Sequence, residues 1–530
     1  MKRKLIKATL ILGIIVVILQ TSCDKDFEIM NVNPNAYTSP DLGMMFTYSL
    51  IEAAGGPGYT NNPLYYNCKV AGAYMQYFAS LNTWQWTGDK YLKKPSYDDA
   101  LYSGTYAQQI KEVTQSIFIT KDNPEQVNHH AINRIWRVYI FHRVTDFYGD
   151  VPYSEAGKGY LEKTFKPKFD KQSDIYADML KELEEAALQL DPDKPSFGPS
   201  DLVYNGDPNK WKKLAYSLML RLGMRLTKVD PAMAETWVKK AIAGGVMSSN
   251  ADNAFLRHSM GTLMNVYSEG SELTAGEGVP PSAKGNGYGK MSKTFVDHLK
   301  ATNDPRGPFY ITLWQGNADP SQMPTSTLLG SQKGLPNGYD ASTIKSLYPS
   351  WVSTVDLPLI SEINLNTVSN YSTPTVYLQY AEIELLLAEA VLRGWETGVV
   401  KTHYDNAVRG SMEIEAIYPG GIRVNPADIE TYLVANPFLA GTFNEQMNQI
   451  HTQFWVSLFM NNLEVWSNYR RTGYPALIPT NYTSNETGGK IPRRVPYPSS
   501  EASTNTVNYN EAIQRQGADL FTTRVWWDKE

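Results

Sequence analysis

Residues 377–392 read YLQYAEIELLLAEAVL, and this stretch indicates the fold of the chain most directly. Its apolar residues recur every three or four positions and Gly394 follows them, so the pattern predicts a helix that ends near the glycine. A second helix is predicted over residues 399–417, after a short connection. The alanines of the Leu-Ala-Glu-Ala run in the first helix and Ala407 in the second are small residues, which allow two helices to touch. The two helices are therefore predicted to pack as a pair.

Helical patterns of the same kind cover much of the chain. Asp207-Pro208 and Asp230-Pro231 each place a capping residue before a proline at the first helical position, which is a strong start signal. The pair over residues 377–417 resembles a tetratricopeptide pair, although no repeat of about 34 residues recurs elsewhere. The other helices are predicted over residues 41–54, 69–81, 98–119, 125–148, 174–190 (capped by Ser173) and 444–471. The predicted fold class is all-α, with tetratricopeptide-like helix pairs that form a scaffold.

Residues 248–373 have a different composition from the helical parts. They are rich in Gly, Pro, Ser, Thr and Asn, and contain only one clear helix, over residues 292–301. A loop-rich insertion of this length is more often functional than idle, so it is predicted to carry the ligand site. One domain is predicted over residues 39–530. Its helical scaffold covers 39–247 and 374–475, and its irregular C-terminal tail covers 476–530.

The N-terminal residues form a secretory signal. A basic start precedes a run of apolar or small residues from Ala8 to Leu19, and small residues precede Cys23. The apolar run is too short to span a bilayer, which takes about 20 residues. Residues 20–23, QTSC, resemble the lipobox of bacterial lipoproteins, although Gln20 stands where that motif usually has leucine. The resemblance implies a signal peptide over 1–22, lipidation of Cys23 and a tether over 23–38; an uncleaved anchor or cleavage without lipidation are the alternatives.

The composition is that of a globular protein with an acidic surface. Apolar residues make up 42% of the 530 positions and charged residues 19%, and the formal net charge is −5. An acidic chain is a poor partner for nucleic acid or for an anionic lipid surface. If Cys23 is acylated, the only other cysteine, Cys68, has no partner for an intrachain disulfide and is predicted to be a buried thiol. The aromatic content of 12% suits both a core and flat ligand surfaces.

Motifs of catalysis are missing from the sequence. It contains no H-E-x-x-H, G-x-S-x-G or P-loop pattern. His129-His130 lack the spaced cysteines or carboxylates of a metal site, and residues 285–289, GNGYG, lack the setting of a dinucleotide loop. No catalytic residue, cofactor or metal is therefore predicted. The sequence does not exclude a pair of glycosidase carboxylates, because the distance between such carboxylates is set by the folded structure and not by their spacing in the sequence.

Aromatic residues in loops are the candidates for ligand binding. Residues 81–89, LNTWQWTGD, alternate tryptophans with amides just beyond a predicted helix end. An aromatic ring can cover the apolar C–H face of a pyranose, while amides and carboxylates bind its hydroxyl groups. The alternative is that these rings only pack the loops onto the scaffold. The candidate residues are Asn82, Trp84, Trp86, Asp89, Tyr288, Trp314, Gln315 and Trp351.

Several motifs, in order along the chain, are similar to those of one family. They are residues 146–156 (DFYGDVPYSEA), 303–306 (NDPR), 334–338 (GLPNG), 464–475 (EVWSNYRRTGYP) and 491–498 (IPRRVPYP). Together they resemble the SusD/RagB family of surface lipoproteins. The resemblance implies a scaffold of tetratricopeptide-like helix pairs and an irregular part that carries the ligand site. It also implies a lipid anchor in the outer membrane that faces the cell exterior, a SusC-like TonB-dependent porin as partner, and no enzymatic activity.

The charged residues of these motifs are predicted to be structural. Asp146, Asp150 and the double arginines at 470–471 and 493–494 are expected to form buried ion pairs that fix helix ends and loops. Capture of a ligand carboxylate by the arginines is the alternative. The function expected from the resemblance is capture of oligosaccharides and their delivery to the porin. The alternatives are a peptide-binding protein of the RagB type, a surface-tethered glycoside hydrolase, or a subunit that only closes the porin.

Overall fold

The computed structural model describes most of the chain after the N-terminal segment. The described residues are 40–56, 63–258, 289–314, 325–364, 366–368, 370, 372–421 and 423–530. Cys23, Tyr288 and Gln315 lie outside them, as do the predicted signal peptide and tether, and Trp314 is described by its backbone alone. None of the helices in the described ranges is both long enough and apolar enough to cross a membrane.

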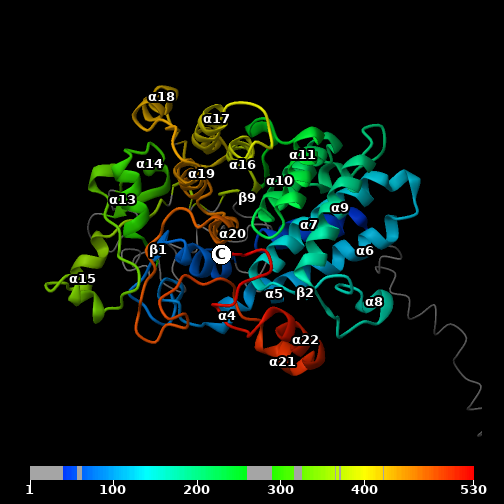
Figure 1. The fold of residues 1–530 in the computed structure, drawn as a ribbon, viewed down its shortest axis with the longest axis horizontal. Coiled ribbons are helices and arrows are strands. Elements are labelled where there is room, and N and C mark those ends of the chain that lie inside the picture. Colours follow the sequence, from blue (N-terminus) through cyan, green and yellow to red (C-terminus); the bar gives the residue numbers. More distant parts are fainter. Residues whose placement is uncertain are drawn as a thin grey trace, which may run out of the picture. The chain divides into compact units, whose positions relative to one another are not determined.

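Helices dominate the described structure, which confirms the predicted all-α class. Helices α6, α7, α9, α10 and α11 form one group of packed neighbours, and α16, α17 and α19 form another (Figure 1). Asp207 caps α10 by accepting hydrogen bonds from two N–H groups of its first turn, and Asp230 caps α11 through the N–H of Met233, as predicted. The longer helices are α3 (Leu42–Ala53), α6 (Ile110–Thr120), α7 (Val127–Tyr148), α9 (Gln172–Gln189), α10 (Pro208–Arg225), α11 (Pro231–Gly244), α16 (Tyr380–Leu392), α17 (Val400–Glu413), α18 (Pro426–Ala435), α19 (Phe443–Ser457), α20 (Asn462–Thr472) and α22 (Thr506–Gln516).

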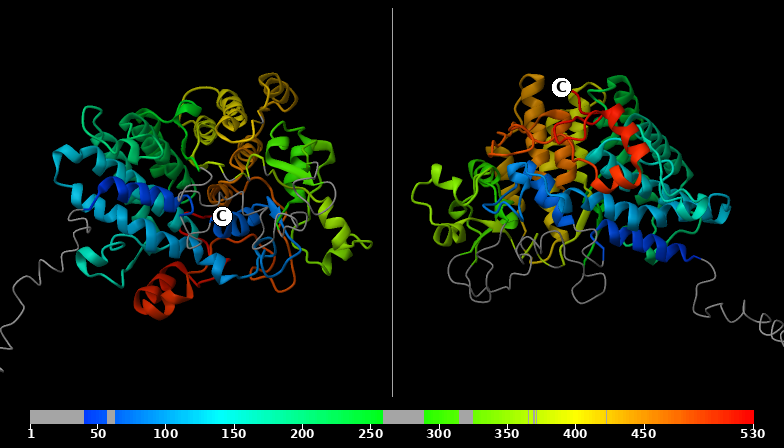
Figure 2. Two further views of the ribbon diagram at one scale, coloured as in Figure 1. Left: turned by 180° about the vertical axis from the view of Figure 1, so that it is seen from behind. Right: turned by 90° about the horizontal axis from the view of Figure 1, so that it is seen from below.

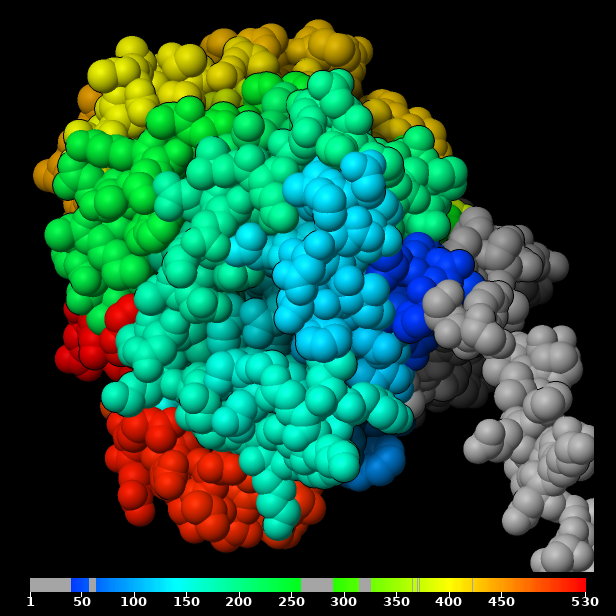
Figure 3. All heavy atoms as spheres, turned by 90° about the vertical axis from the view of Figure 1, so that its right-hand side faces the viewer, coloured from blue at the N-terminus to red at the C-terminus, as the bar shows by residue number. Residues whose placement is uncertain are grey.

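Shorter helices and π-helical segments connect these elements. The short helices are α4 (Pro95–Asp98), α5 (Ala100–Gly104), α8 (Gly159–Glu162), α13 (Lys293–Ala301), α14 (Gly307–Tyr310), α15 (Ser353–Asp356) and α21 (Ser499–Thr504), and the π-helical segments are Leu64–Gly72 and Thr105–Gln109. Helices α6 and α9 lie on the right of Figure 1, and Figure 3 shows that side of the molecule. Helix α15 and strand β1 (Phe78–Ala79) lie on the left of Figure 1.

Several elements differ from the helices predicted from the sequence. The predicted helix over 98–119 is α5, a π-helical segment and α6 in succession. Tyr377 and Leu378 belong to strand β9 (Thr375–Leu378), which pairs with β4 (Ala254–Leu256), so α16 begins only at Tyr380. The predicted helix over 69–81 is instead a π-helical segment that ends at Gly72 and a strand at 78–79. The predicted helix over 444–471 is two helices, α19 and α20. Helix α9 begins at Gln172, with Lys171 rather than Ser173 at its N-cap.

The C-terminal tail also differs from the prediction, because it contains two helices, α21 and α22. Both are polar; α21 has no buried residue and α22 has only Ala512 buried. A helix with so little buried apolar surface leaves almost no periodic signal in the sequence.

Short strands join the insertion to the early part of the chain. β1 pairs with β5 (Lys290–Met291), and β6 (Ile311–Trp314) pairs with β7 (Thr325–Ser326) and β8 (Glu362–Ile363). The N–H of Met291 donates to the carbonyl of Ser361 at 2.9 Å and so links the two strand groups. The remaining pair is β2 (Val151–Pro152) with β3 (Phe169–Asp170). The segment after β1 lies beside the yellow-green segment of residues 340–360 in both views (Figures 1 and 2).

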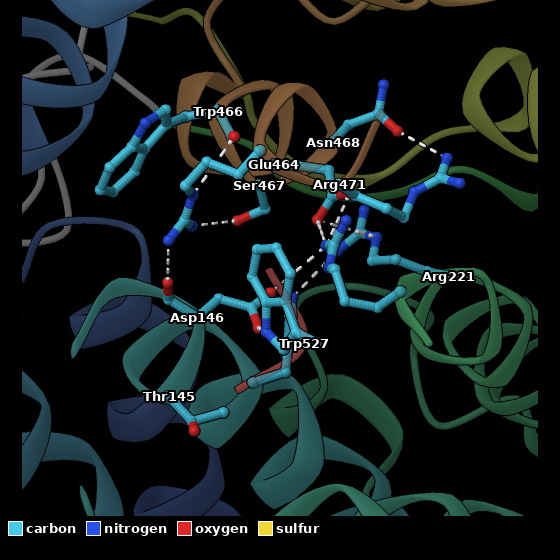
Figure 4. Close-up of polar contacts among 12 residues, drawn as sticks. Thr145, Asp146, Arg221, Glu464, Trp466, Ser467, Asn468, Arg471 and Trp527 are labelled. Atoms are coloured by element: carbon cyan, nitrogen blue, oxygen red, sulfur yellow. Dashed lines mark hydrogen bonds and ion pairs between the residues drawn. The ribbon is translucent and has the colours of Figure 1, made fainter. Parts of the chain in front are cut away.

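A buried network of charged side chains holds the helices together (Figure 4). Arg221 pairs with Glu382 at 2.6 Å, and Arg225 pairs with Glu464 at 2.6 Å and with Asp146 at 3.3 Å. All five side chains are almost inaccessible to solvent. Because a buried charge is costly unless it is paired, these contacts fix α7, α10, α16 and α20 relative to one another.

The double arginines are structural, as predicted. Arg471 binds Glu389 through two hydrogen bonds of 2.7 Å, Arg493 pairs with Asp528, and Arg494 pairs with Asp519 at 2.7 Å. Asp150 pairs with Arg515 at 3.1 Å. Arg470 differs, since its guanidinium donates to backbone carbonyls, including that of Asp146, and stacks on the ring of Trp466. Cys68 is buried, as predicted.

Candidate ligand-binding surface

The loop after β1 presents the ring of Trp84 to solvent. The Oδ1 atom of Asn82 accepts the N–H groups of Trp84 at 2.8 Å and of Gln85 at 2.6 Å, which is a side-chain-stabilised turn. The turn leaves Trp84 69% exposed. The Nζ atom of Lys94 lies 4.2 Å from the centre of its ring, a cation–π contact that holds the indole from one side. An exposed tryptophan on a fixed turn is a flat apolar surface available to a ligand.

Trp86, two residues later, is buried and anchors the loop. It is 4% exposed and packs edge-to-face on Phe78, with ring centres 5.9 Å apart. The backbone of Gly289 also lies on this ring, because a Cβ atom at that glycine would be 2.5 Å from a ring carbon. The environment of Trp86 therefore corresponds to the alternative in which a ring packs a loop onto the scaffold. The contact between Trp86 and Gly289 also brings the start of β5 next to the Trp84 loop.

Asp89 joins three loops rather than facing solvent. Its carboxylate is buried, pairs with Lys90 at 2.8 Å and accepts the N–H groups of Ser80 at 3.4 Å and Gly338 at 3.3 Å. Its carbonyl accepts the hydroxyl of Thr480 at 2.9 Å. Burial raises the pKa of Asp89, and Lys90 with the two backbone N–H groups opposes that rise. Asp89 thus positions the Trp84 loop against the segments that contain Gly338 and Thr480.

Trp351 lies beside this loop in a shared hydrophobic cluster. It is 8% exposed, and its indole N–H donates to the hydroxyl of Ser353 at 3.0 Å. The cluster is made of Ala79, Leu81, Leu335, Ile344, Trp351 and Ile360. Because Leu81 and Trp351 belong to one cluster, the Trp84 loop and residues 344–360 are neighbours. Tyr348, which is 36% exposed, stacks on Trp351 with ring centres 6.0 Å apart.

The aromatic surface is defined by Asn82, Trp84, Lys94, Tyr348 and Trp351. Two of its residues are absent from the sequence prediction. Tyr348 stands three positions before Trp351 in the same loop, and this close spacing of two rings could have identified Tyr348 as a candidate from the sequence. Lys94 has no distinguishing pattern in the sequence, since its role depends on the turn that aims Trp84 at it.

Of the candidates Trp314 and Gln315, only the first lies on a described element, strand β6. Trp314 is its final residue, and Gln315 follows outside the described residues. Strand β6 is joined through β8 to β5 and so belongs to the same group of short strands as β1. Within the described ranges, no group of three or more His, Cys, Asp or Glu side chains is placed to hold a metal ion.

Comparisons with known proteins agree on one family. The SusD-like family model, described as starch-binding and associating with the outer membrane, matches residues 34–498. A solved structure of a chitin-binding protein is 32% identical, with a TM-score of 0.77, over 92% of this chain and 100% of its own. A Bacteroidetes SusD-like protein is 26% identical, with a TM-score of 0.79, over 93% of this chain and 100% of its own. No curated protein sequence matches the chain.

A third solved structure, a SusD homologue from Bacteroides thetaiotaomicron, is 25% identical, with a TM-score of 0.71, over 93% of this chain and 100% of its own. The family model covers most of the chain, and the structural matches cover nearly all of it. The resemblance drawn from the sequence motifs is thereby confirmed. The chain belongs to the SusD-like family.

Proposed function

We propose that this protein captures a neutral oligosaccharide at the cell surface and delivers it to a SusC-like TonB-dependent transporter. In this proposal the protein is held at the outer membrane by lipid on Cys23. The family description and the chitin-binding neighbour support glycan binding. The observation that carries the proposal is the exposed ring of Trp84 on an anchored loop.

The anchoring matters because a fixed ring binds at a lower entropic cost. Asn82 sets the turn, Trp86 packs its far side, and Asp89 ties it to two other loops. A ring that is already ordered loses little freedom when a ligand stacks on it. The aromatic surface is in this sense prepared for a flat, apolar ligand face.

Polar groups beside the ring suit sugar hydroxyls. The Oε1 atom of Gln85 is buried and lacks a hydrogen-bond partner among the described residues. An unpaired buried acceptor is uncommon in proteins and invites a donor from a ligand or from water. A hydrogen bond from a pyranose hydroxyl to this atom requires the Gln85 amide to turn outward, because its Oε1 is buried in the unliganded protein.

Oligomers of N-acetylglucosamine are the first ligand class to test, because the chitin-binding neighbour is 32% identical to this chain. Starch-type oligomers are second, following the family description. A peptide ligand is the alternative within the same type of protein. A tethered glycoside hydrolase is the alternative from another class.

Titration calorimetry of the purified protein tests the proposal with chitohexaose, maltohexaose and an unstructured peptide. Trp84→Ala is expected to weaken binding of the preferred sugar about tenfold or more, since removing one stacked ring costs of the order of 1.4 kcal/mol. Tyr160→Ala is the matched control, because this tyrosine is 84% exposed and lies on α8, away from the aromatic surface.

Three results would contradict the proposal. Peptide binding without sugar binding would favour the RagB-like alternative. Release of shortened products from a polysaccharide would favour the hydrolase. Equal losses from Trp84→Ala and Tyr160→Ala would remove the aromatic surface from the site.

A further inference from the structure

A polar groove of about 520 Å³ lies next to the aromatic surface. It is lined by the start of α13, by residues 336–339 and 343, by residues 478–483 and by Gln76. The volume falls within the roughly 300–1,000 Å³ typical of small-molecule sites. All of its lining residues are described.

The walls of the groove are fixed to one another by tight contacts. Gly338 has a φ of +81°, and a Cβ atom there would lie 2.7 Å from the Cβ of Thr480, so only glycine allows the two walls to approach this closely. The amide of Gln76 donates to the carbonyl of Ile478 at 2.5 Å and accepts the hydroxyl of Thr294 at 2.7 Å. The groove therefore exists before any ligand binds.

The lining chemistry suits a neutral, hydroxyl-rich ligand. The groove is lined by Asn337, Thr343 and Asn481 together with Tyr339 and Tyr482. The side chains of Asn337 and Thr343 already form hydrogen bonds within the protein, to the carbonyl of Phe78 and to Asp340, whereas Asn481 is exposed. Amide and hydroxyl groups both donate and accept hydrogen bonds, as the hydroxyl groups of a sugar do.

The charges in the groove are internally balanced. Its two charged lining residues, Lys293 and Asp297, form an ion pair with each other one helical turn apart. A groove without net charge offers little attraction to an anionic or cationic ligand, and this favours a neutral glycan over a charged one.

The ring of Tyr482 is held in a defined orientation. Its hydroxyl donates to the carboxylate of Asp340 at 2.7 Å. This hydrogen bond, with burial, raises the pKa of Tyr482 to about 12, so the hydroxyl remains a donor at neutral pH. The ring itself is partly exposed along the groove and is free to stack on a sugar face.

Tyr339 connects the groove to the aromatic surface. Tyr339 lines the groove, and it also packs on the hydrophobic cluster that contains Leu81 and Trp351. Asp89 ties the Trp84 loop to both Gly338 and Thr480. From this geometry we infer that the groove is a second glycan subsite, in which Tyr339 and Tyr482 bind further sugar units of an oligosaccharide whose other end lies on Trp84. This inference rests on the proposed function.

Oligosaccharides of different length test the inference in the full-length protein. Chitobiose and chitohexaose are titrated into the wild type and into Tyr482→Ala, with maltose and maltohexaose as the replacement pair if the wild type prefers them. The wild type is expected to bind the hexamer more tightly than the dimer. Tyr482→Ala is expected to weaken the hexamer about tenfold and to leave the dimer unchanged, because only the longer ligand reaches the groove.

Two further variants separate a lost contact from a lost fold. Tyr482→Phe keeps the ring and removes the hydrogen bond to Asp340, so it is expected to retain most of the hexamer affinity. Ile478→Arg places a long side chain at the groove from a position that is 82% exposed, so it is expected to lower hexamer affinity without loss of folding. The thermal midpoint of each variant is measured alongside.

The outcomes distinguish the two levels of the proposal. If wild-type protein binds the hexamer, and both Tyr482→Ala and Ile478→Arg bind it equally well, the groove is not a subsite and the proposed function stands. If wild-type protein binds neither hexamer, both the proposed function and the groove inference are overturned.

Discussion

Trp84 and Trp86 are two residues apart and have opposite environments. The turn set by Asn82 directs the first ring outward, whereas the second is buried against Phe78 and Gly289. Alternation of tryptophans in a polar loop predicts that some rings face outward, but it does not identify which. Asp89 is a similar case, since the groups that bury it come from residues 80, 338 and 480, which no local pattern connects.

This contrast predicts different stability effects for the two rings. Trp86→Ala is expected to lower the unfolding free energy by about 3–5 kcal/mol, because it removes a fully packed aromatic side chain. Trp84→Ala is expected to change it by less than about 0.5 kcal/mol, as for most exposed positions. Urea unfolding followed by circular dichroism measures both. A large destabilisation by Trp84→Ala would mean that this ring packs the loop rather than binding a ligand.

Helices could be predicted from sequence where their signals are local. The caps at Asp207 and Asp230 lie directly before the first turn that they stabilise, and the structure has both. The break between α19 and α20 could not be predicted in this way. There the side chain of Asn67 accepts the N–H of Asn462 at 2.9 Å and donates to the carbonyl of Met460 at 2.7 Å, so a distant residue holds the connection between the two helices.

The contact between α16 and α20 depends on one buried carboxylate. Glu389 on α16 is bound by Arg471 on α20 and also accepts a hydrogen bond from Arg393. Burial alone would raise its pKa, but Arg471, Arg393 and His451 outweigh burial and hold the pKa of Glu389 well below its usual 4.5. A carboxylate with a lowered pKa in the folded state stabilises the fold at pH values above about 4.5, and this contribution is lost as the pH falls below that value.

Glu389→Gln is therefore expected to lower the unfolding free energy at pH 7 by about 3–5 kcal/mol, because Arg471 is left as a buried charge without its partner. The variant is also expected to lose less stability than the wild type when the pH is lowered from 5 to 3. Thermal midpoints across this pH range provide the measurement. Glu430→Gln, which removes an exposed ion pair with Arg409, is the control and should behave as the wild type does. Parallel acid profiles for Glu389→Gln and the wild type would contradict the account.

The whole molecule could be assigned to its family from motifs spread along the sequence, yet the candidate site is assembled from distant segments. Residues 78–94, 289–291, 335–363 and 478–482 meet through short strands, a hydrophobic cluster and single hydrogen bonds. Such contacts leave no periodic signal, which is why Tyr339 and Tyr482 were not among the sequence candidates. Loops with polar and aromatic side chains are nevertheless where binding residues gather on a rigid scaffold.

The central claim is that the exposed ring of Trp84 binds a sugar. A crystal structure of the protein with bound chitohexaose, or with maltohexaose if that is the preferred ligand, tests it most directly. The expected result is a pyranose stacked on the face of Trp84, with hydroxyl groups near Gln85 and the chain continuing toward Tyr339. A well-ordered oligosaccharide bound elsewhere, for example in the groove beside Trp526, with Trp84 free of contact, would contradict it.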